Sequence, residues 1–233
     1  MSENYLVLAA AGLGLRLNEP VPKALVKVKN KPIFIRSLDV LLSSTKWSKI
    51  VIAVPKGWSK EFETSLEKFY SGIDASLVIG GETRQESVYR CLEFLEGEGV
   101  RANANVIIHD AARCLVSKET ILSVLEKLKE VNAVTVVSKV VDTVVKINCG
   151  VVKEVVDREQ LGNVQTPQAF KFGIILKAHK KARKEKVVFT DDATLVSWIG
   201  EDVYVVYGNR WNLKVTEKED LRLLHTLLIA NSD

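Results

Sequence analysis

The sequence predicts an α/β fold in which a mostly parallel sheet is covered by helices on both faces and a β-hairpin arm protrudes. Short β-branched runs alternate with amphipathic segments along most of the 233 residues. This alternation is typical of a parallel sheet with helices packed on each side. It is interrupted over residues 139–161, where two β-branched runs flank a turn. A chain of this length fits one large domain, so we expect a single domain over residues 1–233.

The first part of the chain contains regular strand and helix signals. Apolar, β-branched runs predict strands at residues 5–10, 49–54, 75–79, 105–109 and 133–138. Apolar side chains at helical spacing predict helices at residues 32–44, 84–96 and 118–131. Pro32 suits a first helical turn, and Ser117 is of the residue type that caps a helix.

The segment from 139 to 161 has the pattern of a hairpin around Asn148-Cys149-Gly150. A two-stranded hairpin is marginally stable alone in water. We therefore expect residues 139–165 to project as an arm that packs on another subunit and makes a homodimer. An extra edge hairpin on the main sheet is the alternative.

After the hairpin the alternation resumes, with helices at 172–184 and from Thr190, a strand at 203–207 and a last helix. Thr190 is expected to cap its helix, and Thr216 with Glu219 predicts a capping box. The basic run 177–186 is interpreted as the solvated face of a helix, with an anion-binding patch as the alternative.

Composition excludes several classes of function. The net charge is only +4, and no dense basic stripe indicates a nucleic-acid partner. Three cysteines without CxxC spacing argue against a disulfide framework or a zinc site and fit a reducing compartment. No run approaches the roughly 20 apolar residues of a membrane span, and no signal peptide is recognised. We expect a cytoplasmic protein without membrane or nucleic-acid partners.

The loop after the first strand has the composition of a phosphate-binding turn. It lacks the third glycine of a dinucleotide-binding loop, because Leu17 stands there, and it lacks the GK[ST] of a Walker A loop. Small residues would let backbone N–H groups approach an anion closely; they are Ala10, Ala11, Gly12 and Gly14. Arg16 and Lys23 add two cations, so the loop predicts a polyphosphate site. A glycine-rich turn with two solvated charges is the alternative.

These residues carry a family resemblance. The pattern A-A-G-x-G-x-R-L followed by P-K resembles the signature of nucleotidyltransferases that join a nucleoside monophosphate to a phosphorylated sugar or polyol. From residue 8 to about residue 220 the chain resembles one branch, the 2-C-methyl-D-erythritol 4-phosphate cytidylyltransferase family. The resemblance implies a Rossmann-like three-layer α/β/α nucleotidyltransferase fold, CTP as co-substrate and Mg²⁺ as cofactor. The implied reaction transfers CMP to the polyol phosphate and releases pyrophosphate, in non-mevalonate isoprenoid biosynthesis.

The resemblance also implies the nucleotide site. "GGETRQESV" (80–88) resembles the base-recognition segment, with Gly81, Glu82 and Ser87 near cytosine and Arg84 as a possible support of the loop. A Gly-Gly strand end before a helix is the alternative for this segment. In "HDAARCLV" (109–116), Asp110 and Ala111 would lie near the ribose, with Asp110 also at the metal. Helix capping is the alternative for Asp110, and we expect His109 to be a packing residue rather than a base.

The acceptor contacts implied by the resemblance come from several segments: Arg113, Thr143, Arg158, Thr166 and Thr190. Thr143, Arg158 and Thr166 would reach a polyol phosphate bound mainly to the neighbouring subunit, and Thr190 would touch its phosphate. The catalytic cations would be Arg16, Lys23 and Lys214.

Three positions depart from the family pattern: Ala24, Gly162 and Trp211. Trp211 replaces an acidic residue that many relatives carry, so the acceptor's identity stays open. The rivals are a ribitol-5-phosphate cytidylyltransferase, a sugar-1-phosphate nucleotidyltransferase using UTP or GTP, and a non-catalytic nucleotide-binding subunit.

Overall fold

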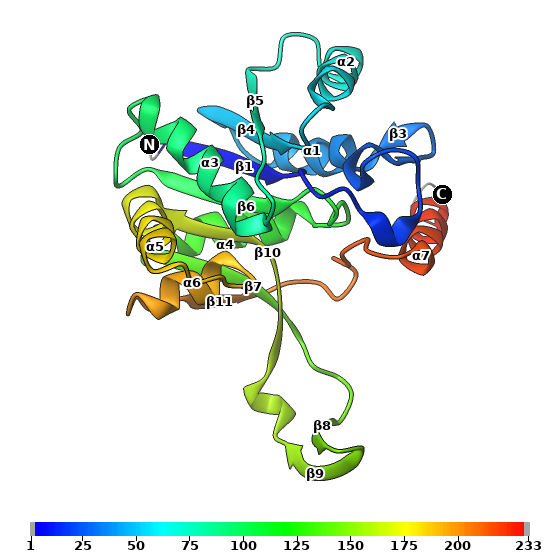
Figure 1. The fold of residues 1–233 in the computed structure, drawn as a ribbon, viewed down its shortest axis with the longest axis vertical. Helices are drawn as coiled ribbons and strands as arrows, with labels where there is room; N and C mark the ends of the chain where they lie inside the picture. The colour runs from blue at the N-terminus through cyan, green and yellow to red at the C-terminus, as the bar shows by residue number, and fades with distance from the viewer. Residues whose placement is uncertain (1–2, 231–233) are drawn as a thin grey trace.

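The computed structural model describes residues 3–230. A sheet crosses the body with helices on both faces, and a hairpin extends away from it (Figure 1). Across the sheet the strands lie in the order β11 (Tyr204–Tyr207), β7 (Ala133–Lys139), β10 (Gly162–Lys171), β6 (Asn105–Asp110), β1 (Asn4–Ala9), β4 (Lys49–Val54) and β5 (Ala75–Ile79). Within this seven-stranded sheet only β10 runs antiparallel to its neighbours. The mostly parallel α/β fold is therefore confirmed.

The helices divide between the two faces of the sheet. One face carries α1 (Ile33–Ser44), α2 (Ser59–Phe69) and α4 (Lys118–Lys127). The other carries α3 (Arg84–Gly97), α5 (Phe172–Glu185) and α6 (Asp192–Trp198). Strand β1 shows the alternation that produces these layers, because Leu6 and Leu8 enter the first core and Val7 the second. No helix among residues 3–230 combines the length and apolar character needed to cross a membrane.

A smaller cluster joins the last helix to the body. Helix α7 (Lys218–Ala230) buries Leu224 against Leu17 and Val215. Two short strands, β2 (Lys27–Val28) and β3 (Lys31–Pro32), pair beside it. The cluster connects the segment that carries Lys214 to the loop after β1.

Two elements had no clear sequence signal. Strand β10 contains Gln165, Thr166 and Gln168, which are polar but buried between β6 and β7. Their side chains bond to groups in the sheet and in the segments beside it: the Gln168 amide donates to Thr135 Oγ1 at 3.1 Å, and the Gln165 amide donates to the Asn209 carbonyl at 3.3 Å. Helix α2 buries only Phe62 and Leu66, so its apolar stripe is narrow. The buried polar side chains of β10 and the narrow apolar stripe of α2 explain why these two were not predicted.

The N-terminal caps are partly as predicted. Ser117 caps α4, with its side chain accepting from Thr120 N–H at 3.2 Å. The prediction for α6 is wrong, because Asp191 rather than Thr190 is the cap and accepts from Thr194 N–H at 2.8 Å. Thr190 is therefore not required by the helix end.

The predicted capping box of α7 is displaced by one residue. Asp220 Oδ2, not the Glu219 carboxylate, accepts from Thr216 N–H at 2.7 Å and from Glu217 N–H at 2.9 Å. Because α7 begins at Lys218, Asp220 is its third residue and has the geometry for this contact.

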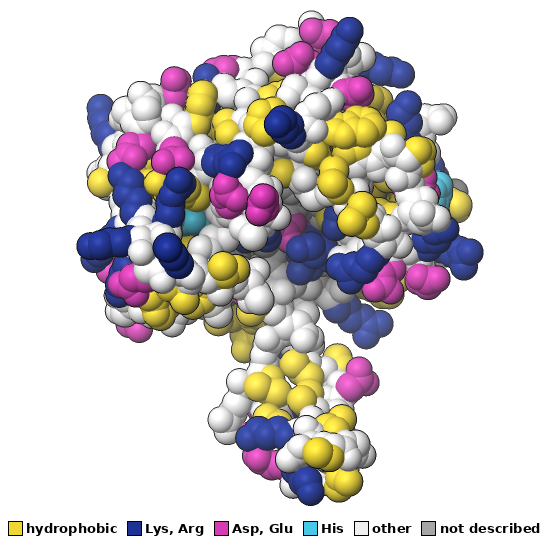
Figure 2. All heavy atoms as spheres, viewed as in Figure 1, with side chains coloured by type: hydrophobic (Ala, Val, Ile, Leu, Met, Phe, Trp, Pro, Cys, Tyr) yellow, Lys and Arg dark blue, Asp and Glu magenta, His cyan; other side chains and the backbone are white. Residues whose placement is uncertain are grey.

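The hairpin forms a two-stranded sheet of its own, of β8 (Val144–Asn148) and β9 (Val151–Val156). The edge-hairpin alternative is therefore wrong. The arm is also shorter than expected, because β10 begins at Gly162 and pairs with β7, so residues 162–165 belong to the main sheet. Hydrophobic side chains cover much of its surface (Figure 2).

Candidate active site

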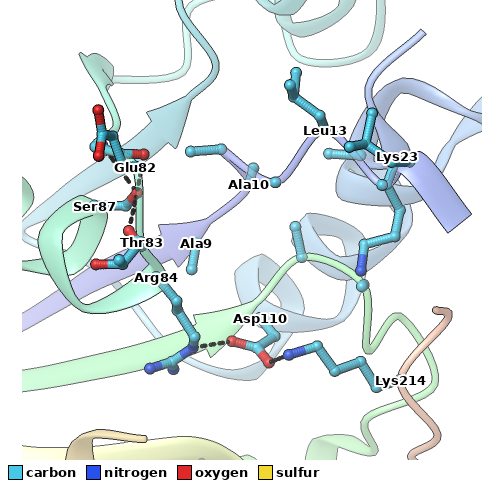
Figure 3. Close-up of a pocket in the computed structure, with 18 of the residues that line it drawn as sticks. Ala9, Ala10, Leu13, Lys23, Glu82, Thr83, Arg84, Ser87, Asp110 and Lys214 are labelled. Carbon is cyan, nitrogen blue, oxygen red and sulfur yellow. Dashed lines mark hydrogen bonds and ion pairs between the residues drawn. The ribbon is translucent and has the colours of Figure 1, made fainter. Parts of the chain in front are cut away.

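A pocket lies where the carboxyl ends of β1, β5 and β6 meet. It has a volume of about 640 Å³, within the usual range of ligand pockets. Ligands gather at this edge of open α/β sheets. The pocket brings together twelve residues predicted from the sequence: Ala10, Ala11, Gly12, Gly14, Arg16, Lys23, Gly81, Glu82, Ser87, Asp110, Ala111 and Lys214. Figure 3 shows many of them around one space.

The loop after β1 forms one wall, and its glycines have different roles. Gly14 has a φ of 70°, and a Cβ there would lie 2.5 Å from the Lys23 Cβ. A Cβ on Gly12 would meet nothing within 4 Å, although Gly12 lines the pocket. Within residues 3–230, the backbone N–H groups of residues 11–14 donate to no protein acceptor. Gly14 thus maintains the loop, while the space beside Gly12 and the unused donors suit an anion.

Alanine substitutions at these two glycines should separate the roles. Gly14→Ala is expected to lower the melting temperature, because a left-handed φ costs a side-chain-bearing residue about 1–2 kcal/mol. Gly12→Ala should melt like the parent but raise the KM for CTP, the substrate that the resemblance implies, about tenfold, the effect of roughly one lost hydrogen bond. Thermal unfolding and steady-state kinetics test both. An unchanged KM in Gly12→Ala would show that no phosphate lies against this loop.

Two cations of the loop region face the same pocket. Lys23 is half-buried and points toward the side of the pocket that holds Asp110 and Lys214 (Figure 3). Burial, together with the positive charges of Lys214 and Arg16, lowers the pKa of Lys23 to about 8. Arg16 is 70 % exposed and pairs with Glu217 at 3.4 Å. A polyphosphate placed here would relieve the repulsion between these cations.

Asp110, at the end of β6, is the anionic centre of the pocket. Its Oδ1 accepts from Arg84 Nε at 2.8 Å, and its Oδ2 lies 2.7 Å from Lys214 Nζ. Burial opposes ionisation, but Arg84 and Lys214 outweigh it and hold the pKa of Asp110 well below its usual range. The carboxylate therefore stays charged at every physiological pH. Because both oxygens accept from side chains, the helix-capping alternative is not what the structure shows.

Arg84 belongs to a buried network that the sequence analysis missed. Its second contact is to Asp192 Oδ2, at 2.7 Å from NH1. Asp192 in turn lies 3.0 Å from Nε2 of the buried His179, through its other oxygen. Asp192 lies at the start of α6, far along the chain from Arg84. The partners are 108 residues apart in the chain, so no local signal could have paired them.

The segment 80–88 forms the opposite wall. Ser87 Oγ donates to Thr83 O at 2.8 Å and accepts from Gly81 N–H at 3.0 Å. Glu82 N–H donates to Glu86 Oε2 at 3.0 Å. A Cβ on Gly81 would lie 2.2 Å from the Glu86 side chain. Ser87 and Glu86 of α3 therefore hold this loop in a rigid shape through their hydrogen bonds to Gly81, Glu82 and Thr83.

The predicted acceptor residues are not gathered in this pocket. Thr143 and Arg158 lie on the arm, where Arg158 NH1 donates to Val141 O at 2.6 Å. Thr190 is exposed beside α6. Arg113 donates to the Asn212 carbonyl at 2.8 Å and thereby ties two loops together.

Thr166 is buried in β10, away from the arm. Its Oγ1 accepts from Asp110 N–H at 3.0 Å and lies 3.1 Å from His109 Nδ1. Burial lowers the pKa of His109 to about 4, and its Nε2 lies 3.1 Å from Arg113 O. His109 does not line the pocket, so its prediction as a packing residue is confirmed.

The structure shows the surroundings of the three residues that depart from the family pattern. Gly162 lies against β7, where a Cβ would come within 3.1 Å of Val137 Cβ. Ala24 is buried at the pocket wall. Trp211 is 44 % exposed under the Arg210 guanidinium, and nothing in the structure explains its choice.

Comparison with known proteins agrees with this geometry. The family model described as IspD, 2-C-methyl-D-erythritol 4-phosphate cytidylyltransferase, matches residues 5–229. A protein of that name from Geobacillus kaustophilus is 35% identical over 228 residues, covering 97% of this chain and 98% of its own. Another, from Bacillus cytotoxicus, is 34% identical over 223 residues and 96% of each chain.

Solved structures show the same similarity. The 4-diphosphocytidyl-2C-methyl-D-erythritol synthase of Anaerococcus prevotii superimposes with a TM-score of 0.84 at 28% identity, covering 97% of this chain and 96% of the other. The Francisella tularensis 2-C-methyl-D-erythritol 4-phosphate cytidylyltransferase gives 0.81 at 28% identity, covering 97% and 99%. These matches favour neither the ribitol phosphate alternative nor the non-catalytic one. The chain belongs to the 2-C-methyl-D-erythritol 4-phosphate cytidylyltransferase family.

Proposed function

We propose that the pocket binds CTP with its triphosphate on the loop of residues 10–16 and its base against residues 80–87. Arg16, Lys23 and Lys214 then stabilise the charge that develops around the α-phosphate. The observation that carries this proposal is the convergence of three cations and a glycine loop with unused N–H donors on one 640 Å³ space. Transfer of a phosphoryl-type group depends mostly on orientation and electrostatic stabilisation.

The reaction follows from family membership: CMP is transferred from CTP to 2-C-methyl-D-erythritol 4-phosphate with release of pyrophosphate, in isoprenoid biosynthesis. The acceptor's own phosphate oxygen is the nucleophile. A phosphate monoester has a second pKa near ~6, so it is largely dianionic at neutral pH. No protein base is needed, which agrees with the buried position of His109 outside the pocket.

Selection of cytosine is assigned to the rigid loop that contains Gly81 and Glu82. Cytosine offers an amino donor beside a ring acceptor, and uracil reverses that order. Fixed backbone groups would leave the wrong base mispaired, at about 1–3 kcal/mol per buried group. Ser87 keeps the loop in shape and is proposed to lie near the base.

The residues present also fit a divalent cation. Mg²⁺ is usually held by one or two carboxylates together with substrate phosphates. Asp110 presents such a carboxylate on the pocket wall, and residues 3–230 contain no group of three or more acidic, His or Cys side chains able to hold a metal alone. Asp110 would therefore hold a cation that arrives with CTP. When bound, Mg²⁺ would neutralise charge on the phosphate oxygens.

The arm is proposed to complete the site of a second subunit in a homodimer. Its apolar side chains are open to solvent in one chain, with Ile147 66% and Val155 65% exposed. A hairpin of this kind needs packing to be stable. Thr143 and Arg158 lie on this arm rather than in the pocket, so they would reach the acceptor across the dimer. Arg113 and Thr190 are proposed to line the acceptor side, while Thr166 holds Asp110 through its backbone.

Pyrophosphate release in a substrate panel tests the proposed function. We expect release with CTP and methylerythritol phosphate, and at least tenfold lower kcat/KM with UTP or GTP because of the mispaired base. Ribitol 5-phosphate should be the poorer acceptor. Equal rates with UTP would contradict the role of the 80–87 loop. Equal rates with both polyols would leave nucleotide selection intact but refute acceptor selection.

A further inference from the structure

The ammonium group of Lys214 is assigned two different anionic partners. Its Nζ lies 2.7 Å from Asp110 Oδ2, while the proposed function requires the same ammonium to contact substrate phosphate. The Asp110 side chain is only 7% exposed, and an unpaired buried carboxylate is strongly unfavourable. Lys214 can leave Asp110 only if another cation remains there.

Arg84 is the protein's own cation at that place, and it is in position before a divalent cation arrives with CTP. Its Nε donates to Asp110 Oδ1 at 2.8 Å, so each oxygen of the carboxylate has its own positive partner. In Figure 3 Arg84 and Lys214 approach Asp110 from opposite sides. The Arg84 side chain is 23% exposed, whereas that of Lys214 is 36% exposed and continues into the pocket. Arg84 is thus the fixed partner and Lys214 the accessible one.

The far side of Arg84 is anchored by elements outside the pocket. Its NH1 donates to Asp192 at the start of α6. The Asp192 side chain is 1% exposed, and its Oδ1 lies 3.0 Å from Nε2 of His179 in α5. Gln168 Oε1 of β10 accepts from Asp192 N–H at 3.1 Å. The alternating charges of Lys214, Asp110, Arg84 and Asp192 therefore end in buried groups that do not line the pocket.

We propose that Arg84 is a positioning residue that orients Asp110 and supplies the counter-charge which frees Lys214 to pass from Asp110 to the substrate phosphate. The inference rests on the proposed function of Lys214. Without Arg84, Lys214 is the remaining cation that contacts Asp110, and it stays there when substrate binds. Loss of Arg84 should then affect turnover through Lys214, and should leave the KM for CTP, set by the loop of residues 10–16, within a few-fold of parental.

The test is a cycle in which a charge-balanced pair of substitutions is made with and without Lys214. Arg84→Gln with Asp192→Asn removes one buried charge of each sign, which avoids an uncompensated carboxylate. In the parental background kcat should fall about 10–100-fold, as for loss of an outer partner of a site ligand. In the Lys214→Met background the same pair should change kcat less than about threefold, because coupled residues are non-additive. Lys180→Gln with Glu96→Gln removes an exposed pair between α5 and α3 and should keep the parental kcat.

Equal losses of kcat in both backgrounds would show that Arg84 has only a structural role and would overturn the inference. A parental kcat for Arg84→Gln with Asp192→Asn would overturn it as well. A parental kcat for Lys214→Met alone would refute the proposed function of Lys214, and this inference with it. Thermal unfolding shows whether the pair is folded. If the double variant is unfolded, Arg84→Lys is used in its place. Lysine keeps the positive charge, but its single amine cannot contact both Asp110 and Asp192. Arg84→Lys should lower kcat in the parental background and not in Lys214→Met, and an equal loss in both would again overturn the inference.

Discussion

Replacing Lys23 with methionine is expected to lower kcat by about 10²–10³, or roughly 3–4 kcal/mol of transition-state stabilisation, by analogy with the loss of one oxyanion donor. Methionine keeps the stem that packs against Gly14, where the structure has no spare space. The melting temperature should hardly change, because burial already opposes the charge of Lys23 in the folded protein. Lys23→Ala keeps the Cβ that lies against Gly14 and should lose as much activity. Single-turnover kinetics and thermal unfolding measure the two effects.

The pH profile identifies the Lys23 charge itself. With a pKa of about 8, Lys23 loses its proton as the pH rises through 8, and its attraction for the triphosphate is lost with it. The kcat/KM for CTP should therefore fall above pH 8 in the parental protein. Lys23→Arg keeps its charge and should show no such fall, and Lys23→Met should be low and flat. The same fall in all three proteins would assign it to another group.

Replacing Arg158 with alanine should raise the KM for the polyol phosphate about 10–150-fold, because a charge-assisted hydrogen bond contributes about 1.5–3 kcal/mol. Binding of CTP, measured by calorimetry, should be unchanged, since Arg158 lies on the arm and not among the residues of the pocket. Folding should also be intact, because the side chain is 50% exposed. Equal weakening of CTP binding would contradict the assignment.

Mixing two damaged proteins tests whether the arm acts on the partner. In a dimer of one Lys23→Met chain and one Arg158→Ala chain, one site would combine an intact pocket with an intact arm. Random exchange makes about half of the dimers mixed, so activity should recover to about a quarter of the parental value. Arg158→Ala mixed with Lys180→Met is the matched control. About half of its sites combine an intact pocket with an intact arm, so it should give about half of the parental activity. No recovery, with mixed dimers present by native mass spectrometry, would mean that each arm serves its own chain or none.

Much of the fold was predictable because its signals are local. The strands at 49–54 and 75–79 agree with the prediction residue for residue, since each is a short β-branched run between polar turns. The glycine loop and its two cations were also recognisable, because their spacing is fixed within the fourteen residues 10–23. Strand β10 was not, because its buried glutamines and threonine find hydrogen-bond partners in strands, a loop and a helix that are distant in the sequence.

By itself, the sequence determined the strand and helix alternation, the phosphate-type loop and the family to which the chain belongs. The tertiary structure alone decided that Arg84 faces Asp110 and Asp192, that Thr166 is buried behind Asp110, and that the arm ends before Gly162. The physical reason is the range of the interactions. Periodicity, turn residues and glycine freedom act between neighbours along the chain, whereas the pairing of buried charges depends on which elements the folded sheet brings together.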